Sequence, residues 1–262
     1  MVWGNIMPMT REEIENCNKR SKHNDLIKLD VGLSDLKEGI FLRTLRRYEI
    51  YIHRIVIVID PGHGVITGRS IDHGAVRLID PNGRTWGDNV RYQESDIVLD
   101  ISKKLKISLE NIIRDVEVYL TRETELDNLD NYSELERPPL DFRWKFANDK
   151  NADYLISIHC NSSDNSEISG FLVCYDKQTE DNIKLSEKII TNVTLYPDNN
   201  KGHRWQELRA LRGFEKEAVL IELGYISNDN DVALMTERAV ELVNDIAQGI
   251  KNYIEEKEKI IN

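Results

Sequence analysis

The sequence has few cysteines, no long apolar segment and a deficit of positive charge. Its 262 residues include three cysteines, and none of them lies in a CxxC pair: Cys17, Cys160 and Cys174. An odd number of thiols without that spacing indicates neither a disulfide framework nor a thiolate zinc site. The longest uninterrupted apolar run is Ile55–Ile59, whereas a transmembrane helix needs about 20 apolar residues, so we expect no membrane span.

The charge balance bears on possible partners. Lys and Arg number 35 against 46 Asp and Glu, which gives a formal net charge of −11 at pH 7. Proteins that bind nucleic acid neutralise phosphates with clustered basic residues, so this balance argues against nucleic acid as a partner. The first residues, MVWGNIMPMTREE, lack the regions of a secretory signal. We therefore expect a chain that stays in the cytoplasm, leaves by an unconventional route, or has lost a signal.

Apolar runs of strand length alternate with stretches of helical period from Arg54 onward. This alternation predicts an α/β fold, a single-domain, mostly parallel twisted sheet with helices on both faces. The strands are expected at 54–60, 116–120, 154–158, 171–175 and 218–222, and the helices at 95–114, 140–150, 180–194 and 231–256.

The first 50 or so residues differ from the rest because they are charge-dense and lack a strong apolar strand. The segment from Thr10 to Glu13 fits a helix capping box, so we predict a helical arm of unknown role over 1–53. Residues 54–262 are then one domain of catalytic size.

Three polar residues stand at the ends of predicted strands. His63 follows RIVIVID in the segment DPGHG, His159 ends YLISIH, and Glu222 ends AVLIE. Because the carboxyl ends of parallel strands lie along one edge of a sheet, we expect these side chains to meet there. Glu94 opens a predicted helix and could lean over the same edge.

Two imidazoles and one carboxylate, with a fourth position open, form a recognised ligand set for catalytic zinc. A further carboxylate could accept a proton from water as that water attacks a carbonyl, and Glu222 suits this role as well as it suits ligation. Taken singly, each of these histidines is more often a structural residue. The remaining four are expected at the surface: His23, His53, His73 and His203. The glycines of DPGHG give only a weak phosphate-binding signal, since GxxxxGK[ST] and GxGxxG are lacking.

Four motifs occur in a characteristic order: VIDPGHG around His63, ESDIVL at Glu94, SIHCN around His159 and VLIELGYISN around Glu222. Together they resemble the zinc-dependent N-acetylmuramoyl-L-alanine amidases of the amidase-3 family. The segments VYLTRETE and DFRWKFAND also fit, and the likeness spans roughly Arg54 to Tyr253.

The resemblance implies a phosphorylase/hydrolase-like α/β fold and a specific reaction. One Zn2+ per chain would be held by His63, Glu94 and His159, and Glu222 would be the catalytic carboxylate. The substrate would be peptidoglycan, cut at the amide between N-acetylmuramic acid and the L-alanine of the stem peptide. Such an enzyme acts on the cell wall, either as a phage endolysin released through holin lesions or as a bacterial remodelling enzyme.

Two features depart from the family. The distance from His63 to Glu94 is 94 − 63 = 31 positions, longer than the family usually shows. If Glu94 is misassigned, the candidates to replace it are Asp72, Asp88 and Asp96. The long loop over 65–91 is either a wall of the substrate groove, with Trp86 and Arg84 touching glycan or peptide, or a solvated loop.

The second departure concerns regulation. Some family members carry a helical insertion before the catalytic Glu that blocks the groove, whereas Gly170 to Glu222 leaves room for one predicted helix, 180–194. We therefore predict an enzyme that needs no activator. Two other functions stay open: a non-catalytic wall-binding protein on the same fold, and a zinc peptidase that cuts another peptidoglycan amide.

Overall fold

The computed structural model describes residues 25–28, 49–52, 54–64, 66–67, 70–79, 90–124 and 140–261. The chain divides into two compact units, Met1–Ile55 and Val56–Asn262. In the first unit, β1 (Asp25–Lys28) pairs antiparallel with β2 (Glu49–Ile52). The helix predicted from Thr10 lies outside the described residues.

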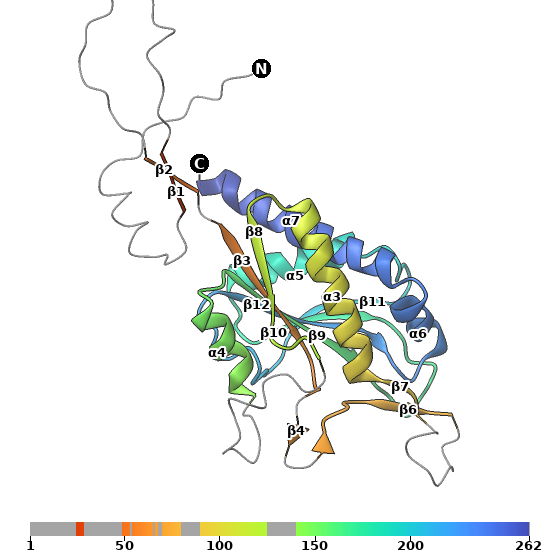
Figure 1. The fold of residues 1–262 in the computed structure, drawn as a ribbon. Helices are drawn as coiled ribbons and strands as arrows, with labels where there is room; N and C mark the ends of the chain where they lie inside the picture. The colour runs from red at the N-terminus through yellow and green to blue at the C-terminus, as the bar shows by residue number, and fades with distance from the viewer. Residues whose placement is uncertain are drawn as a thin grey trace, which may run out of the picture. The chain divides into compact units, whose positions relative to one another are not determined.

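The second unit is built on a six-stranded sheet with the strand order β11-β10-β12-β9-β3-β8 (Figure 1). At its centre β9 pairs parallel with both β3 and β12, whereas β10 runs antiparallel to β12 and parallel to β11. The strands are β3 (Ile55–Pro61), β8 (Val116–Leu120), β9 (Tyr154–Asn161), β10 (Phe171–Tyr175), β11 (Asn200–Trp205) and β12 (Glu217–Tyr225). The predicted mostly parallel sheet is confirmed, and β11 is an addition that its polar sequence, NKGHRW, does not indicate.

Helices cover both faces of the sheet, as predicted. On one face Val56, Val58, Leu155 and Leu220 join one buried cluster with Ala147 of α4 (Asp141–Asp149). Because side chains alternate along a strand, the residues between them point to the other face, which α3 and α5 contact, and α7 packs on those two helices (Figure 1). Those helices are α3 (Glu94–Ile112), α5 (Glu180–Asn192) and α7 (Ala239–Ile261).

The helix expected over 231–256 is two helices. α6 (Asp229–Thr236) ends where the backbone N–H groups of Glu237 and Arg238 both donate to the carbonyl of Ala233, and α7 begins at Ala239. The apolar stripe continues across the break, and neither glycine nor proline marks it, so the periodicity alone predicted one helix. Two hairpins complete the unit: β4 (Ile66–Thr67) with β5 (Ser70–Ile71), and β6 (Val76–Leu78) with β7 (Val90–Gln93).

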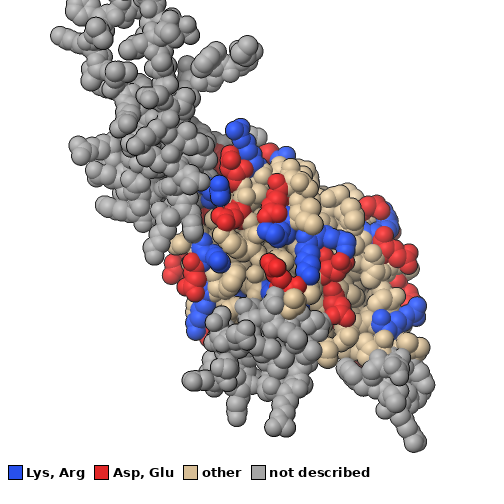
Figure 2. Space-filling model, viewed as in Figure 1, with Lys and Arg blue, Asp and Glu red and all other residues tan. Residues whose placement is uncertain are grey.

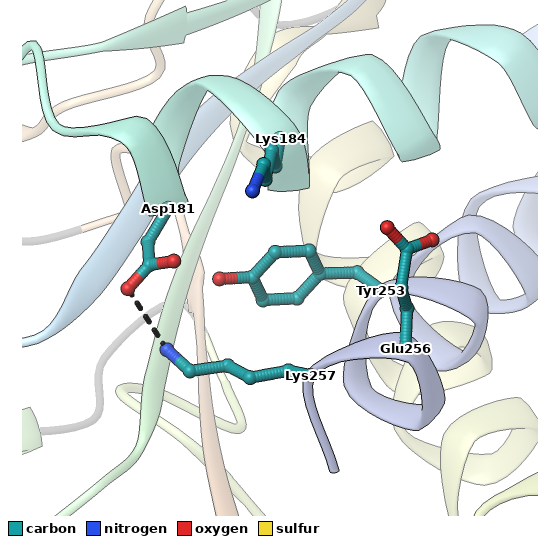
Figure 3. Close-up of a pocket in the computed structure, with 5 residues that line it drawn as sticks. All are labelled: Asp181, Lys184, Tyr253, Glu256 and Lys257. Atoms are coloured by element: carbon teal, nitrogen blue, oxygen red, sulfur yellow. Dashed lines mark hydrogen bonds and ion pairs between the residues drawn. The ribbon is translucent and has the colours of Figure 1, made fainter. Parts of the chain in front are cut away.

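A charged pocket lies where α5 and α7 meet the start of β12. Lys257 of α7 donates to Asp181 of α5 at 3.0 Å (Figure 3). It also pairs with Glu217, the first residue of β12. Tyr253, Lys184 and Glu256 complete the lining. Because Glu217 begins β12 and Glu222 lies five residues further toward its carboxyl end, this pocket is separate from the strand ends considered below.

The surface around α3 carries interspersed charges of both signs (Figure 2). Two of the pairs are i,i+4 ion pairs within that helix, Lys104 with Asp100 and Lys106 with Glu110. No helix in the described part of the chain is long and apolar enough to cross a membrane.

Candidate metal centre

The carboxyl ends of β3, β9 and β12 bring the predicted polar residues to one edge. Pro61 pairs with Ile158, and His159 pairs with Glu222, so both pairs lie at nearly the same height in the sheet. His159 and Glu222 therefore stand side by side on neighbouring strands and point to the same face. β9 and β12 continue slightly beyond these residues, to Asn161 and Tyr225.

The turn after β3 carries His63 and has a backbone that few side chains tolerate. His63 itself has φ 59°, in the left-handed region. Gly62 lies against His159, where an added Cβ would come within 2.4 Å of the imidazole Cε1. Only glycine at this position lets the two histidines approach, and their ring centroids are 5.0 Å apart.

A buried ion pair fixes the base of that turn. Asp60 is fully buried and pairs with Arg143 of α4. Its carboxylate also accepts hydrogen bonds from Thr121 Oγ1 at 2.6 Å and from Ser157 Oγ at 2.7 Å. Burial raises the pKa of Asp60, but Arg143 and the two hydroxyls outweigh burial and lower it. Arg143 then donates to the carbonyls of Pro61 and His63, at 3.0 and 3.3 Å.

A second buried arginine, Arg122, follows β8 and holds the other side of the turn. It donates to the carbonyl oxygens of Pro61 at 3.1 Å and Gly62 at 2.8 Å. The same guanidinium donates to the carbonyl of Ser95 at 2.9 Å, in the first turn of α3. Arg122 therefore ties the turn that carries His63 to the helix that carries Glu94.

Glu94 lies between the two histidines, as its placement at the start of α3 suggested. Its Oε1 is 3.2 Å from His63 Nε2 and 3.0 Å from His159 Nδ1. The three ligand atoms lie within 4.8 Å of one another. Burial raises the pKa of Glu94, but the hydrogen bonds from His159 and His63 outweigh burial and hold it well below its usual value. An anionic oxygen that faces two imidazole nitrogens is the donor set of a divalent transition metal.

Backbone N–H groups also hold both oxygens of Glu94. Oε2, the oxygen away from the histidines, accepts from the N–H of Ala75 at 2.9 Å, and Oε1 accepts from that of Cys160 at 2.9 Å. Gly74 has φ 66°, and a Cβ there would lie 2.6 Å from Glu94 Oε2. The 70–79 segment is therefore part of the cradle around Glu94.

Asp72 is a partner of His63 rather than a substitute for Glu94. Its Oδ2 accepts from His63 Nδ1 at 3.0 Å, which leaves His63 Nε2 directed at Glu94. Burial lowers the pKa of His63, but the hydrogen bonds to Asp72 and Glu94 outweigh burial and raise it to about 9. The hydrogen bond from His63 lowers the pKa of Asp72 to about 2, against the effect of burial. A carboxylate on the outer nitrogen of a histidine is the usual support of a metal-ligating imidazole.

Glu222 lies beside this cluster without joining it. Its Oε2 is buried and has no hydrogen-bond partner among the described residues. Burial raises its pKa, an effect that His159 and His63 partly oppose. A carboxylate with one unsatisfied oxygen and a raised pKa is equipped to take a proton and to give it back.

The structure brings His63, Glu94 and His159 together with Glu222 next to them. Among the alternative ligands, Asp96 is exposed on α3, and Asp88 lies outside the described residues, as do Trp86 and Arg84. Of the other histidines that we expected at the surface, His73 and His203 are partly buried. His23 and His53 are not among the described residues.

Sequence reasoning missed three supporting residues, Asp60, Arg122 and Arg143, and named Asp72 only as an alternative ligand. Arg122 and Arg143 stand in segments that matched the family, VYLTRETE and DFRWKFAND, so the motif signal was present but gave no role. For Asp60 the signal was a carboxylate that directly follows a five-residue apolar run, because a charge there is seldom buried without a partner.

Comparisons with known proteins agree with this geometry. The family model described as N-acetylmuramoyl-L-alanine amidase matches residues 57–252. The chain is 25% identical over 210 residues to the germination-specific N-acetylmuramoyl-L-alanine amidase of Bacillus subtilis, and this match covers 77% of this chain and 81% of that protein. It is 30% identical over 206 residues to the probable cell wall amidase LytH of Staphylococcus saprophyticus, and that match covers 76% of this chain and 58% of the relative.

Among solved structures, the N-acetylmuramoyl-L-alanine amidase AmiC2 of Nostoc punctiforme superposes with a TM-score of 0.59 at 27% identity. The match covers 78% of this chain and 98% of that one.

Proposed function

The chain belongs to the amidase-3 family of N-acetylmuramoyl-L-alanine amidases, and from this premise we propose that it is a zinc-dependent hydrolase of peptidoglycan. The bond cut is the amide between N-acetylmuramic acid and the L-alanine of the stem peptide. The observation that carries the proposal is the convergence of His63, Glu94 and His159 to within 4.8 Å, next to a buried carboxylate with an unsatisfied oxygen.

The donor set fits zinc. His63 Nε2, His159 Nδ1 and a Glu94 oxygen would be its ligands, because Asp72 occupies the other nitrogen of His63. Two imidazoles and a carboxylate leave a position for water or substrate, as catalytic zinc sites do. Bound there, zinc supplies a Lewis acid that polarises a carbonyl and makes water a nucleophile near neutral pH.

The chain's own residues perform the proton transfer and the positioning. Glu222 Oε2 accepts a proton from the attacking water and returns it to the nitrogen of the leaving L-alanine. Burial favours the protonated form of Glu222, so the group can hold that proton between the two steps. Asp72 orients His63, and Arg122 and Arg143 keep the turn rigid while the substrate binds.

We also propose that the enzyme acts on the wall without an activator. Residues 176–216, all of them described, contain one helix, α5, between β10 and β12. α5 belongs to the core, where Leu185 and Ile189 are fully buried. The purified zinc-loaded chain is expected to digest peptidoglycan alone, and a strict need for an added partner protein would contradict this.

Mass spectrometry of muropeptides after digestion tests the reaction. The expected products are stem peptides with a free L-alanine amino group, lost on addition of a chelator and in Glu222→Gln. Glu215→Gln, which removes an exposed carboxylate close in sequence, serves as the matched control and should leave the products unchanged. Cleavage within the stem would indicate the zinc peptidase instead, and absence of any product would indicate the wall-binding protein.

A further inference from the structure

The edge strand β11 contains a β-bulge next to the site. Phe171 of β10 pairs with Asn200, but Val173 pairs with His203, so a step of two residues in β10 is matched by three in β11. Gly202 lies in this step with φ 74°, the left-handed backbone that such a bulge uses. Because side chains alternate along a strand, one extra residue moves every later side chain to the other face.

The bulge decides which side chain of β11 faces the site. Arg204 pairs with Cys174, which pairs with Leu220 of β12, and Leu220 is two residues before Glu222. Since partners in register point to the same face, Arg204 and Glu222 share a face. An unbulged strand would put His203 there instead.

The position of His203 confirms this orientation. It pairs with Val173, and its ring lies 5.9 Å from that of Tyr175. Its Nε2 lies 3.8 Å from Glu187 of α5, which covers the opposite face of the sheet.

Arg204 is within electrostatic reach of the site. β10 separates β11 from β12, so the Cα atoms of Arg204 and Leu220 are roughly 10 Å apart. Glu222 lies two residues further along β12. Burial raises the pKa values of Glu222 and Cys174, and Arg204 opposes the increase in both. The guanidinium therefore stands on the outer side of Glu222, away from the metal ligands.

Arg204 forms no ion pair with a carboxylate of the described chain. It is exposed, and no described carboxylate lies within 4.0 Å of its nitrogens. The next two arginines along the chain are engaged: Arg209 pairs with Asp141 at 3.1 Å, and Arg212 with Glu207 at 2.5 Å. The guanidinium is hydrogen-bonded to the Cys174 side chain. Because it is exposed and pairs with no described carboxylate, its remaining N–H groups are suited to bind one with two parallel hydrogen bonds.

We propose that Arg204 binds a free carboxylate of the leaving stem peptide and thereby selects stems in which this group is not amidated. The inference rests on the proposed function, because that function places the peptide in the site. The residue after L-alanine carries a carboxyl group that is free in some peptidoglycans and amidated in others. Two extended residues span roughly 7 Å, less than the roughly 10 Å between the Arg204 and Leu220 Cα atoms, and the Arg204 side chain would bridge the remainder. For a chain with net charge −11, such a local contact replaces long-range attraction.

Kinetics on two muramyl-peptides that differ only in this group, free acid or amide, test the proposal. Wild type is expected to prefer the acid, and Arg204→Met to lower kcat/KM on the acid by about 10- to 100-fold, mainly through KM, with less than about a threefold change on the amide. Arg204→Lys should recover part of the preference because it keeps the charge. Lys184→Met removes one cation from α5, on the opposite face of the sheet, and should leave kcat/KM on both substrates unchanged.

An equal loss on both substrates would show that Arg204 supports the fold or Glu222 and would overturn the inference, as would unchanged kinetics on both. If the wild type cleaves neither substrate, the proposed function fails, and calorimetric titration of the zinc-loaded chain with the free stem peptides decides the inference by itself. Tighter binding of the acid peptide that Arg204→Met weakens about tenfold supports it, and equal binding of acid and amide overturns it.

Discussion

The buried pair of Asp60 and Arg143 is expected to be the most sensitive support of the site. Asp60 has no exposed surface, and the Arg143 side chain is 8% exposed. Asp60→Asn keeps the size of the side chain and removes the charge, which leaves the guanidinium buried without a counter-charge. Breaking a buried pair in this way costs about 3–5 kcal/mol of unfolding free energy.

Urea denaturation measures this loss. With a slope of about 2–3 kcal/mol per molar urea, the midpoint should fall by about 1–2.5 M. The double variant Asp60→Asn/Arg143→Met removes both charges, so it should be more stable than the sum of the single changes predicts, by about 2 kcal/mol or more. Asp141→Asn breaks the more exposed pair with Arg209 and serves as the control, with an expected loss of less than about 1 kcal/mol. A loss of less than about 1 kcal/mol for Asp60→Asn, with additivity in the double variant, would refute this reasoning.

The same pair predicts a pH dependence. The folded-state pKa of Asp60 lies below its usual value of 3.8, so its contribution to stability is present above that value and is lost as pH falls through the lower folded value. The difference in stability between wild type and Asp60→Asn should therefore be constant above about pH 5 and shrink in acid.

Four further predictions concern the proposed metal ligands and their supports. Asp72→Asn should weaken zinc binding about 10- to 100-fold in a chelator competition, because it frees the outer nitrogen of His63, whereas Asp96→Asn, on the exposed side of α3, should not. Gly74→Ala should reduce zinc affinity at least about tenfold in the same assay, because the new Cβ would lie 2.6 Å from Glu94 Oε2 at a φ of 66°. Zinc affinity should rise with pH up to about 9, where His63 loses its proton, and calorimetry in buffers of different ionisation enthalpy should detect the released proton. In the metal-free chain the stabilisation from protonated His63 is complete below pH 6.5 and is lost as pH rises through about 9, so His63→Gln should remove that pH dependence.

The sequence predicted the parts of the fold that depend on apolar periodicity. His63 follows the run that became β3, and His159 and Glu222 lie near the carboxyl ends of β9 and β12. The rule that parallel strands end at one edge was enough to bring these residues together. Glu94 needed the family motif, because a carboxylate in the first turn of a helix is favoured there whether or not it binds a metal.

The supporting residues could not be derived in this way, because they depend on the conformation of turns. Asp72 reaches His63 only because the 70–79 segment folds back over Glu94, where Gly64 N–H donates to the Asp72 carbonyl at 2.7 Å. The register of β11 likewise depends on a bulge at Gly202, and a one-residue shift in a polar strand leaves no trace in the hydrophobic pattern.

The central claim is that His63, Glu94 and His159 hold one metal ion that faces Glu222. A crystal structure of the zinc-loaded chain, with anomalous diffraction recorded at the zinc edge, tests it most directly. The account predicts one peak per chain, about 2.0–2.2 Å from His63 Nε2, His159 Nδ1 and a Glu94 oxygen, with the Glu222 carboxylate directed at its open side. A zinc ion held by other residues, or no peak at this site with zinc present in excess, would contradict it.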